Sequence, residues 1–333
     1  MMKRTRHIWS AGIALLAVAA ISSETVWASN CGITRPIRVI VGYGPGGGTD
    51  SYARILAGSI PEFLDETPMV IINKPGGAQV IAMKQAQSAK PDGHTLQVLA
   101  MGGALMATMM RDQGINWFED FKPIAQFGVT NQALVVQRES GITTANGLLD
   151  MIRVSFSKGK KTRWSHPGRG SVSHIGVTAF LAMNNVLDMT QDVPFKGGAE
   201  TRNALISDEV GFSASGAHTV PPFEDKLVAV GLIAEERDPV VSDIPTLAEQ
   251  NVPYVPTSSP IVLVAAKAVP DDIVTCLSEA VKKAVDHEAF KLLTKKSEQA
   301  IVYRDASETQ IYLQKLAAGL EPIVNLVRER LEN

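Results

Sequence analysis

A glycine-rich turn between an apolar run and a polar helix start is the segment of this chain best suited to hold a ligand. Residues 37–41 predict a buried strand, and the turn Gly42 to Gly48 and the polar pair Thr49-Asp50 follow it directly. Glycine lets backbone N–H groups approach a ligand without a Cβ in the way, and a helix N-terminus carries a partial positive charge. The turn therefore predicts a cradle for a carboxylate or a phosphate.

The same turn satisfies the spacing G-x-G-x-x-G of dinucleotide-binding proteins, with glycines at 42, 44 and 47. Two features oppose that interpretation. The next predicted strand ends in Asn73, where a dinucleotide site needs an acidic residue for the ribose, and Pro45 removes one N–H group from the turn. A glycine turn with a purely structural role is the other alternative to an anion site.

A second segment, Ser165 to His174, is rich in serine and glycine and also runs into a predicted helix start. It offers backbone N–H and hydroxyl donors. Ser171, His174 and Asp188 could be drawn as a nucleophile, base and acid, but the G-x-S-x-G elbow of hydrolases is absent. The histidines show none of the short spacings typical of zinc sites. We therefore expect no catalytic residues, no metal and no cofactor.

Both segments lie at strand-to-helix corners of a regular pattern. Short β-branched runs alternate with amphipathic segments of helix length, which is typical of parallel α/β architecture. The predicted strands are residues 37–41, 69–72, 95–100, 134–137, 162–165, 210–213, 228–233 and 261–265. The predicted helix starts, each a side-chain acceptor before an apolar stripe, are Thr49-Asp50, Thr144, Ser173 and Ser307.

Composition excludes several classes of protein. The 333 residues are 45% hydrophobic and 20% charged, which is typical of a globular chain. With 32 Lys and Arg against 34 Asp and Glu, the formal charge is -2, so we expect no nucleic-acid partner. Residues 1–28 combine a basic start, an apolar stretch and the sequence Val26-Trp27-Ala28. This combination predicts a cleavable signal peptide and an exported protein.

The chain has two cysteines, Cys31 and Cys276, and both follow the predicted signal peptide. An oxidising compartment would permit one disulfide between them. Two free thiols are the alternative, and the sequence leaves both open because it carries no information on the geometry of the pair.

The order and spacing of the motifs resemble those of a known family, the periplasmic solute receptors of tripartite tricarboxylate transporters, also called the Bug family. The resemblance spans nearly the whole chain after residue 28. The motifs that carry it are Arg35-Pro36-Ile37-Arg38, Pro45-Gly46-Gly47-Gly48-Thr49-Asp50, Asn73-Lys74-Pro75-Gly76-Gly77, Pro91-Asp92-Gly93-His94-Thr95-Leu96, residues 168–174, Val193-Pro194-Phe195-Lys196-Gly197 and Asp243-Ile244-Pro245-Thr246-Leu247-Ala248-Glu249.

The resemblance implies a periplasmic protein of α/β class with the two-domain periplasmic-binding-protein (Venus flytrap) architecture and a ligand cleft at the hinge. The implied division is a signal peptide at 1–28, a first domain of residues 29–133 plus 258–333, and a second domain of residues 134–257. The chain is expected to cross between the domains near residues 132–136 and to return near 257–262, with the C-terminal helices on the first domain.

The resemblance also implies the binding residues. The first domain would contribute Tyr43, Gly46, Gly47 and Thr49, with Gly102 and Gly103 closing the same side. The second domain would contribute His166, Gly168, Arg169, Gly170, Ser171, Lys196, Gly197 and Ser215. Two facing cradles of this kind would hold the two ends of a dicarboxylate.

Departures from the family pattern bear on the ligand. Ser215 stands where many relatives carry Asp, which would suit the ammonium of an amino acid, so we expect a ligand without a positive group. Arg169 would either fork onto a ligand carboxylate or be an exposed loop residue. His166 at the rim of the pocket would make binding change as the pH crosses about 6.5. We expect Arg202 to be a solvated surface residue.

The function implied by the resemblance is that of a receptor, not an enzyme. It would bind a di- or tricarboxylate or a similar organic acid as a monomer and deliver it to the membrane permease subunits of a tripartite transporter. The alternative is a secreted sensor or scaffold of the same fold that signals its bound state to a partner, because fold does not by itself determine function.

Overall fold

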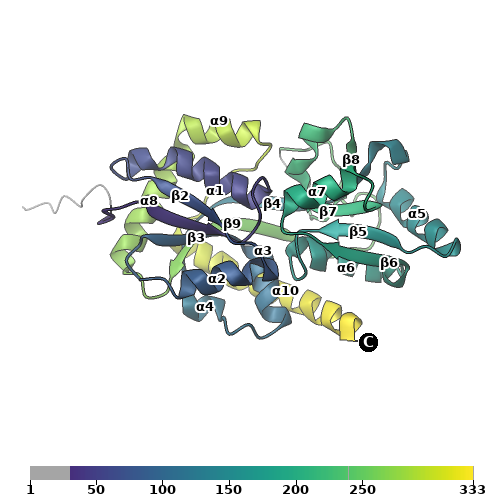
Figure 1. Cartoon of the computed structure of the whole chain (residues 1–333), viewed down its shortest axis with the longest axis horizontal. Helices are drawn as coiled ribbons and strands as arrows, with labels where there is room; N and C mark the ends of the chain where they lie inside the picture. The colour runs from purple at the N-terminus through teal and green to yellow at the C-terminus, as the bar shows by residue number, and fades with distance from the viewer. Residues whose placement is uncertain (1–30, 239, 333) are drawn as a thin grey trace, which may run out of the picture.

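The computed structural model describes residues 31–238 and 240–332, so the predicted signal peptide lies outside the described residues. One mixed sheet runs through two lobes, with strand order β2-β1-β3-β9-β4-β7-β5-β6 and with β8 paired to β4 (Figure 1). The strands are β1 (Ile37–Val41), β2 (Met69–Asn73), β3 (Thr95–Ala100), β4 (Phe121–Gln137), β5 (Thr162–His166), β6 (Thr190–Pro194), β7 (Phe212–Gly216), β8 (Leu227–Leu232) and β9 (Ser258–Ala266).

Helices cover both faces of the sheet in each lobe. They are α1 (Gly48–Ser59), α2 (Val80–Gln87), α3 (Met101–Met110), α4 (Trp117–Asp120), α5 (Ala145–Ser157), α6 (Val172–Met183), α7 (Gly198–Ile206), α8 (Asp271–Asp286), α9 (Glu288–Lys296) and α10 (Ala306–Glu332). Among the described residues, none of these helices combines the length and the apolar character needed to cross a membrane.

The first lobe is built on β1, which pairs in parallel with β2 and β3. Alternate side chains of a strand point to opposite faces of the sheet. Val39 and Val41 pack in the cluster with α1 and α8, whereas Ile40 packs in the cluster with α2, α3 and α10. Because both faces are buried, β1 is apolar almost throughout, as the sequence predicted.

The second lobe repeats this arrangement around β5, which pairs in parallel with β6 and β7. Trp164 on β5 stacks on Phe212 of β7, with ring centroids 5.8 Å apart. The α5 and α6 helices pack on this side, and α7 packs in a separate cluster on the other side. The sheet is mixed rather than purely parallel, because β4 and β9 run antiparallel to their neighbours.

The lobes are joined by β4, a strand of 17 residues. Its first part pairs with β9, and its last residues pair with β7 and β8. The sequence predicted only residues 134–137 of this strand. The pattern fails before them because the pairing with β9 shifts register between Pro123 and Ala125 and again between Gln126 and Gly128, which breaks the alternation of side chains.

The C-terminal helices are shared unequally between the lobes. The α8 and α9 helices pack on α1, but the long α10 contacts both α3 of the first lobe and α6 of the second, as Figure 1 shows. All three C-terminal helices therefore contact the first lobe, and α10 also reaches the second.

Three of the four predicted helix starts were misplaced. The α1 helix begins at Gly48, before the predicted Thr49-Asp50, with Gly47 at its N-cap and no side-chain cap. Thr144 caps α5 as predicted, accepting from the Gly147 N–H at 3.1 Å. The cap of α6 is Ser171 rather than Ser173, and it accepts from the His174 N–H at 3.2 Å. The cap of α10 is Asp305 rather than Ser307, because its carboxylate accepts from the Glu308 N–H at 2.8 Å.

Cys31 and Cys276 form a disulfide, with Cα atoms 5.5 Å apart, which settles the alternative left open by the sequence. The bond ties the start of the described chain to α8 across a sequence separation of 245 residues. A disulfide of this kind stabilises a fold by roughly 2–4 kcal/mol, mainly by restricting the unfolded chain.

Candidate functional site

The turn before α1 is held by a buried carboxylate. Asp50 in the first turn of α1 accepts from the Gly46 N–H at 2.9 Å, from Arg54 Nε at 2.8 Å and from Asn73 Nδ2 at 2.8 Å. Burial alone would raise the pKa of Asp50, but these hydrogen bonds outweigh it and lower the pKa below its ordinary value. The Asp50 carboxylate is therefore fully engaged in holding the turn. No side chain caps the N-terminus of α1.

Three helix N-termini from the two lobes converge on one small pocket of about 60 Å³, here called the inner pocket. They are α1, α6 and α7, and α7, like α1, has no side-chain cap. The described residues that line it include neither an acidic nor a lysine or arginine side chain: Tyr43, Gly47, Gly48, Thr49, Ala100, Thr130, Gln132, Pro167, Val172, Ser173, Gly198, Ser215, Gly216, His218 and Thr219. Converging helix N-termini with no charged side chain favour an anion.

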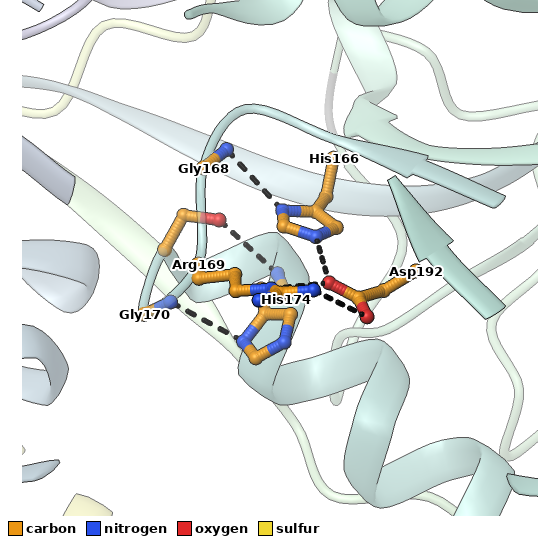
Figure 2. Close-up of polar contacts among 7 residues, drawn as sticks. His166, Gly168, Arg169, Gly170, His174 and Asp192 are labelled. Atoms are coloured by element: carbon orange, nitrogen blue, oxygen red, sulfur yellow. Dashed lines mark hydrogen bonds and ion pairs between the residues drawn. The ribbon is translucent and has the colours of Figure 1, made fainter. Parts of the chain in front are cut away.

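The loop before α6 is shaped by a buried network, drawn in Figure 2. His166 Nδ1 accepts from the Gly168 N–H and His174 Nδ1 from the Gly170 N–H, both at 3.2 Å. Asp192 of β6 accepts from His166 Nε2 at 3.1 Å. Each imidazole thus fixes one glycine of the loop, and each must leave Nδ1 unprotonated to do so.

Arg169 completes this network. Its Nε and Nη2 atoms fork onto the two carboxylate oxygens of Asp192 at 2.8 and 3.2 Å. Hydrogen bonding from His166, followed by that from Arg169, lowers the pKa of Asp192 well below its usual range. The fork that the sequence analysis considered for a ligand is made to Asp192, with the Arg169 side chain 66% exposed.

His166, His174 and Asp192 also lie close enough together to reach one metal ion. A metal-bound histidine normally donates its second ring nitrogen to an acceptor. Here the Nδ1 atoms accept from backbone N–H groups, so the protons lie on Nε2, and Asp192 is already neutralised by Arg169. The donor set therefore fits a hydrogen-bonded network better than a metal site.

The two lobes touch beside the inner pocket. The Gly44 N–H donates to the Lys196 carbonyl at 2.9 Å, and a Cβ on Gly197 would lie 3.0 Å from the Gly44 nitrogen. These contacts join the turn after β1 to the turn after β6. The structure therefore has its two lobes closed on the pocket.

The structure places the predicted binding residues in three groups. Tyr43, Gly47, Thr49 and Ser215 line the inner pocket. Tyr43 also lines a larger outer cleft of about 420 Å³, together with the predicted residues Gly168, Arg169 and Lys196. The remaining predicted residues line neither the inner pocket nor the outer cleft: Gly46, Gly102, Gly103, His166, Gly170, Ser171 and Gly197.

Two of the sequence expectations need correction. His166 is fully buried in its network and does not form the rim of a pocket, so the rim-based pH effect loses its basis. Arg202 is not a solvated residue, because its guanidinium lies 4.3 Å from the centre of the Phe223 ring and its Nε atom is buried.

Several residues that line the inner pocket were not predicted from the sequence. Gly48, Val172, Ser173 and Gly198 adjoin predicted positions, so a wider reading of the same motifs would have found them. Thr130 and Gln132 belong to the part of β4 that the pattern missed. His218 follows β7 in the turn η5 (Ala217–Thr219), and no sequence signal points to it.

A larger groove of about 1040 Å³ lies between α10 and the segments 234–237 and 255–258. Its lining includes side chains of both charges, among them Glu235, Glu236, Arg304 and Lys315. The α10 residues there belong to the interior of the helix and present no N–H groups. The groove therefore lacks the anion-binding features of the inner pocket.

The fold and the closed pocket between lobes define a protein of the two-domain periplasmic-binding class. Solved structures support this: MatC from Rhodopseudomonas palustris, with bound malate, is 25% identical and has a TM-score of 0.79, with 87% of this chain and 99% of that chain covered. Periplasmic binding protein BugD is 21% identical with a TM-score of 0.79, over 89% of this chain and 98% of that chain.

Comparison of sequences gives the family. The family model for the tripartite tricarboxylate transporter family receptor matches residues 52–328. The UPF0065 protein in the gbd 5' region of Cupriavidus necator is 32% identical over 292 residues, 86% of each chain. Protein BugT of Bordetella pertussis is 24% identical over 290 residues, 85% of this chain and 83% of that protein. The chain therefore belongs to the tripartite tricarboxylate transporter receptor family, as the motifs predicted.

Proposed function

We propose that this protein is a monomeric periplasmic receptor that binds a small di- or tricarboxylate or a similar organic acid. It delivers this acid to the permease subunits of a tripartite transporter and performs no catalysis. The observation that carries the proposal is the convergence of the N-termini of α1, α6 and α7 on an inner pocket without charged side chains. Such a pocket stabilises an anion through backbone dipoles and N–H groups.

The pocket chemistry favours an organic acid over an amino acid. An ammonium group needs an acidic partner when it is buried, and the lining of the inner pocket has none. Ser215, at the position where an acidic residue would serve this purpose, is hydrogen-bonded to the Ser213 hydroxyl at 2.8 Å. The malate bound to MatC, a relative of the same fold, supports the same ligand class.

Closure of the two lobes is the signal in this proposal. The proposed lobes are residues 29–133 plus 258–333 and residues 134–257, with the hinge where β4 leaves the first lobe and where the chain returns to it at the start of β9. A carboxylate that contacts helix N-termini of both lobes binds the closed state more tightly than the open state, so it shifts the population towards closure. The permease then recognises the closed form.

A thermal-shift panel of mono-, di- and tricarboxylates tests the ligand class. An acid present at 100 times its Kd should stabilise the purified protein by about 2.7 kcal/mol. The matched amino acids of the same chain length should give no shift, because the pocket offers no partner for their ammonium groups. Stabilisation by amino acids without stabilisation by dicarboxylates would contradict the proposal.

Delivery is tested separately from binding. Deleting the coding sequence for this chain should abolish uptake of the stabilising acid by cells, and restoring it should recover uptake. If the acid binds the protein but uptake does not depend on the chain, a sensor of the same fold becomes the better description.

A further inference from the structure

His218 reaches from the second lobe to the helix of the first. A Cβ on Gly48 in α1 would lie 2.5 Å from His218 Nε2 and from Cε1, and a Cβ on Gly216 in β7 would lie 2.5 Å from Cε1. The imidazole therefore occupies a slot between two glycines, one from each lobe. All three residues line the inner pocket.

The nitrogen at the α1 end of this ring has no partner in the described part of the chain. His218 Nε2 is buried and makes no hydrogen bond within residues 31–238 and 240–332. Burial lowers the pKa of His218 to about 4; Asp238 acts against this and Arg202 adds to it, so the ring is neutral near pH 7. Buried polar atoms are rarely left unsatisfied in native proteins, and those that are often mark a functional position.

The position of Nε2 matters because Gly48 is the first residue of α1. An anion held by the free N–H groups of this helix start lies beside Gly48 and hence beside the imidazole. A neutral imidazole can offer one N–H donor to a carboxylate oxygen. The donor comes from the lobe opposite the helix, so it is available only when the lobes are closed.

We propose that His218 is the residue through which the second lobe hydrogen-bonds the carboxylate held at the N-terminus of α1. This inference rests on the proposed function and deepens it. Because the contact exists only in the closed state, it contributes to the difference in affinity between the open and closed forms, and that difference is what drives closure.

His218→Phe tests the proposal because it keeps a planar ring in the slot and removes both nitrogens. We expect the Kd for malate, measured by calorimetry, to rise at least 10-fold. Malate at saturation should also produce a smaller decrease in the radius of gyration by small-angle X-ray scattering than in the wild type. The melting temperature of the ligand-free variant should not fall, since the lost Nε2 atom has no partner among the described residues.

Further variants keep the test decisive. His218→Gln retains an N–H donor and should recover part of the affinity, and His218→Ala replaces the Phe variant if that one does not fold. His287→Phe, which alters the half-exposed cap of α9 in the first lobe, is the matched control and should bind malate like the wild type.

The outcomes separate the two proposals. If the wild type binds malate and the Phe, Ala and Gln variants bind it equally well with the same compaction, the role of His218 is overturned while the receptor function stands. If the wild type binds none of the acids of the panel, the proposed function is overturned, and this inference with it.

Discussion

At the scale of single residues, the second-lobe side of the site depends on one buried histidine that stays neutral, His174. His174 is buried against Trp164, with ring centroids 6.0 Å apart, and its Nδ1 holds the Gly170 N–H. Burial, followed by the proximity of His166, lowers the pKa of His174 from 6.5 to about 3. A protonated His174 would lose the acceptor that shapes the loop before α6.

This pKa shift makes the fold acid-sensitive in a defined window. The unfolded chain takes up a proton at His174 below about pH 6.5, whereas the folded chain does so only near pH 3, so stability falls as the pH drops between these values. One buried histidine changes the free energy of unfolding by at most about 1.4 kcal/mol per pH unit. In His174→Gln, which keeps an acceptor but cannot titrate, urea unfolding should depend less on pH from 6.5 to 3. Equal slopes in both proteins would contradict this account.

The sequence located the residues of the site by segment but not by role. It identified the turn after the first strand and the loop before residue 174, because glycine and serine at strand-to-helix corners have local causes. The sequence did not predict that Asp192 would accept hydrogen bonds from both His166 and Arg169, because only the pairing of β5 with β6 brings these residues together. Long-range pairing of charged groups leaves no local signal.

At the scale of elements, closure depends on two backbone corners that approach closely. Gly197 has an extended backbone, with φ of 174°, so any residue could adopt its conformation. What requires glycine is space, because a Cβ there would lie 3.0 Å from the Gly44 nitrogen and 3.4 Å from its carbonyl oxygen. Neither backbone atom can move aside as a flexible side chain could.

Gly197→Ala should therefore hinder closure without unfolding either lobe. Overpacking of this kind typically costs about 1–3 kcal/mol, which corresponds to a Kd for malate roughly 5- to 150-fold higher. Calorimetry gives the Kd, and the melting temperature of the ligand-free protein should not change. Gly44→Ala is the matched control, because its Cβ would have its nearest contact at 3.5 Å, an ordinary distance. Equal losses in both variants would rule out the steric explanation.

Regular elements were predicted far better than the strand that joins the lobes. The strands at residues 37–41 and 95–100 match β1 and β3 residue for residue, because their cause is an apolar run buried on both faces. The strand β6 (Thr190–Pro194) was missed, since its sequence Thr-Gln-Asp-Val-Pro is mostly polar or half-exposed. In β4 the register shifts at two places break the alternation in the first part, and the polar run Thr130-Asn131-Gln132, which includes two residues of the pocket, separates it from the predicted residues 134–137.

At the scale of the whole molecule, the closed lobes limit the size of the ligand. A water molecule needs roughly 10–15 Å³ of cavity space. The inner pocket, with about 60 Å³, therefore has room for only a few chemical groups the size of a water molecule. Tyr43 and Pro167 line both this pocket and the outer cleft. An acid too long for the inner pocket must extend past these residues, into the space where the lobes meet.

Four-carbon dicarboxylates should therefore bind more tightly than six-carbon ones. Malate or succinate extends least beyond the inner pocket and should let the lobes close, whereas adipate should keep the lobes apart and lose a hydrogen bond from one of them to its charged carboxylate. Such a bond contributes about 1.5–3 kcal/mol, so the Kd for adipate should be roughly 10- to 150-fold higher. Titration calorimetry across a series of linear dicarboxylates measures this, and scattering should show full compaction only with the short acids. Tighter binding of adipate with equal compaction would mean that the closed pocket does not set the size of the ligand.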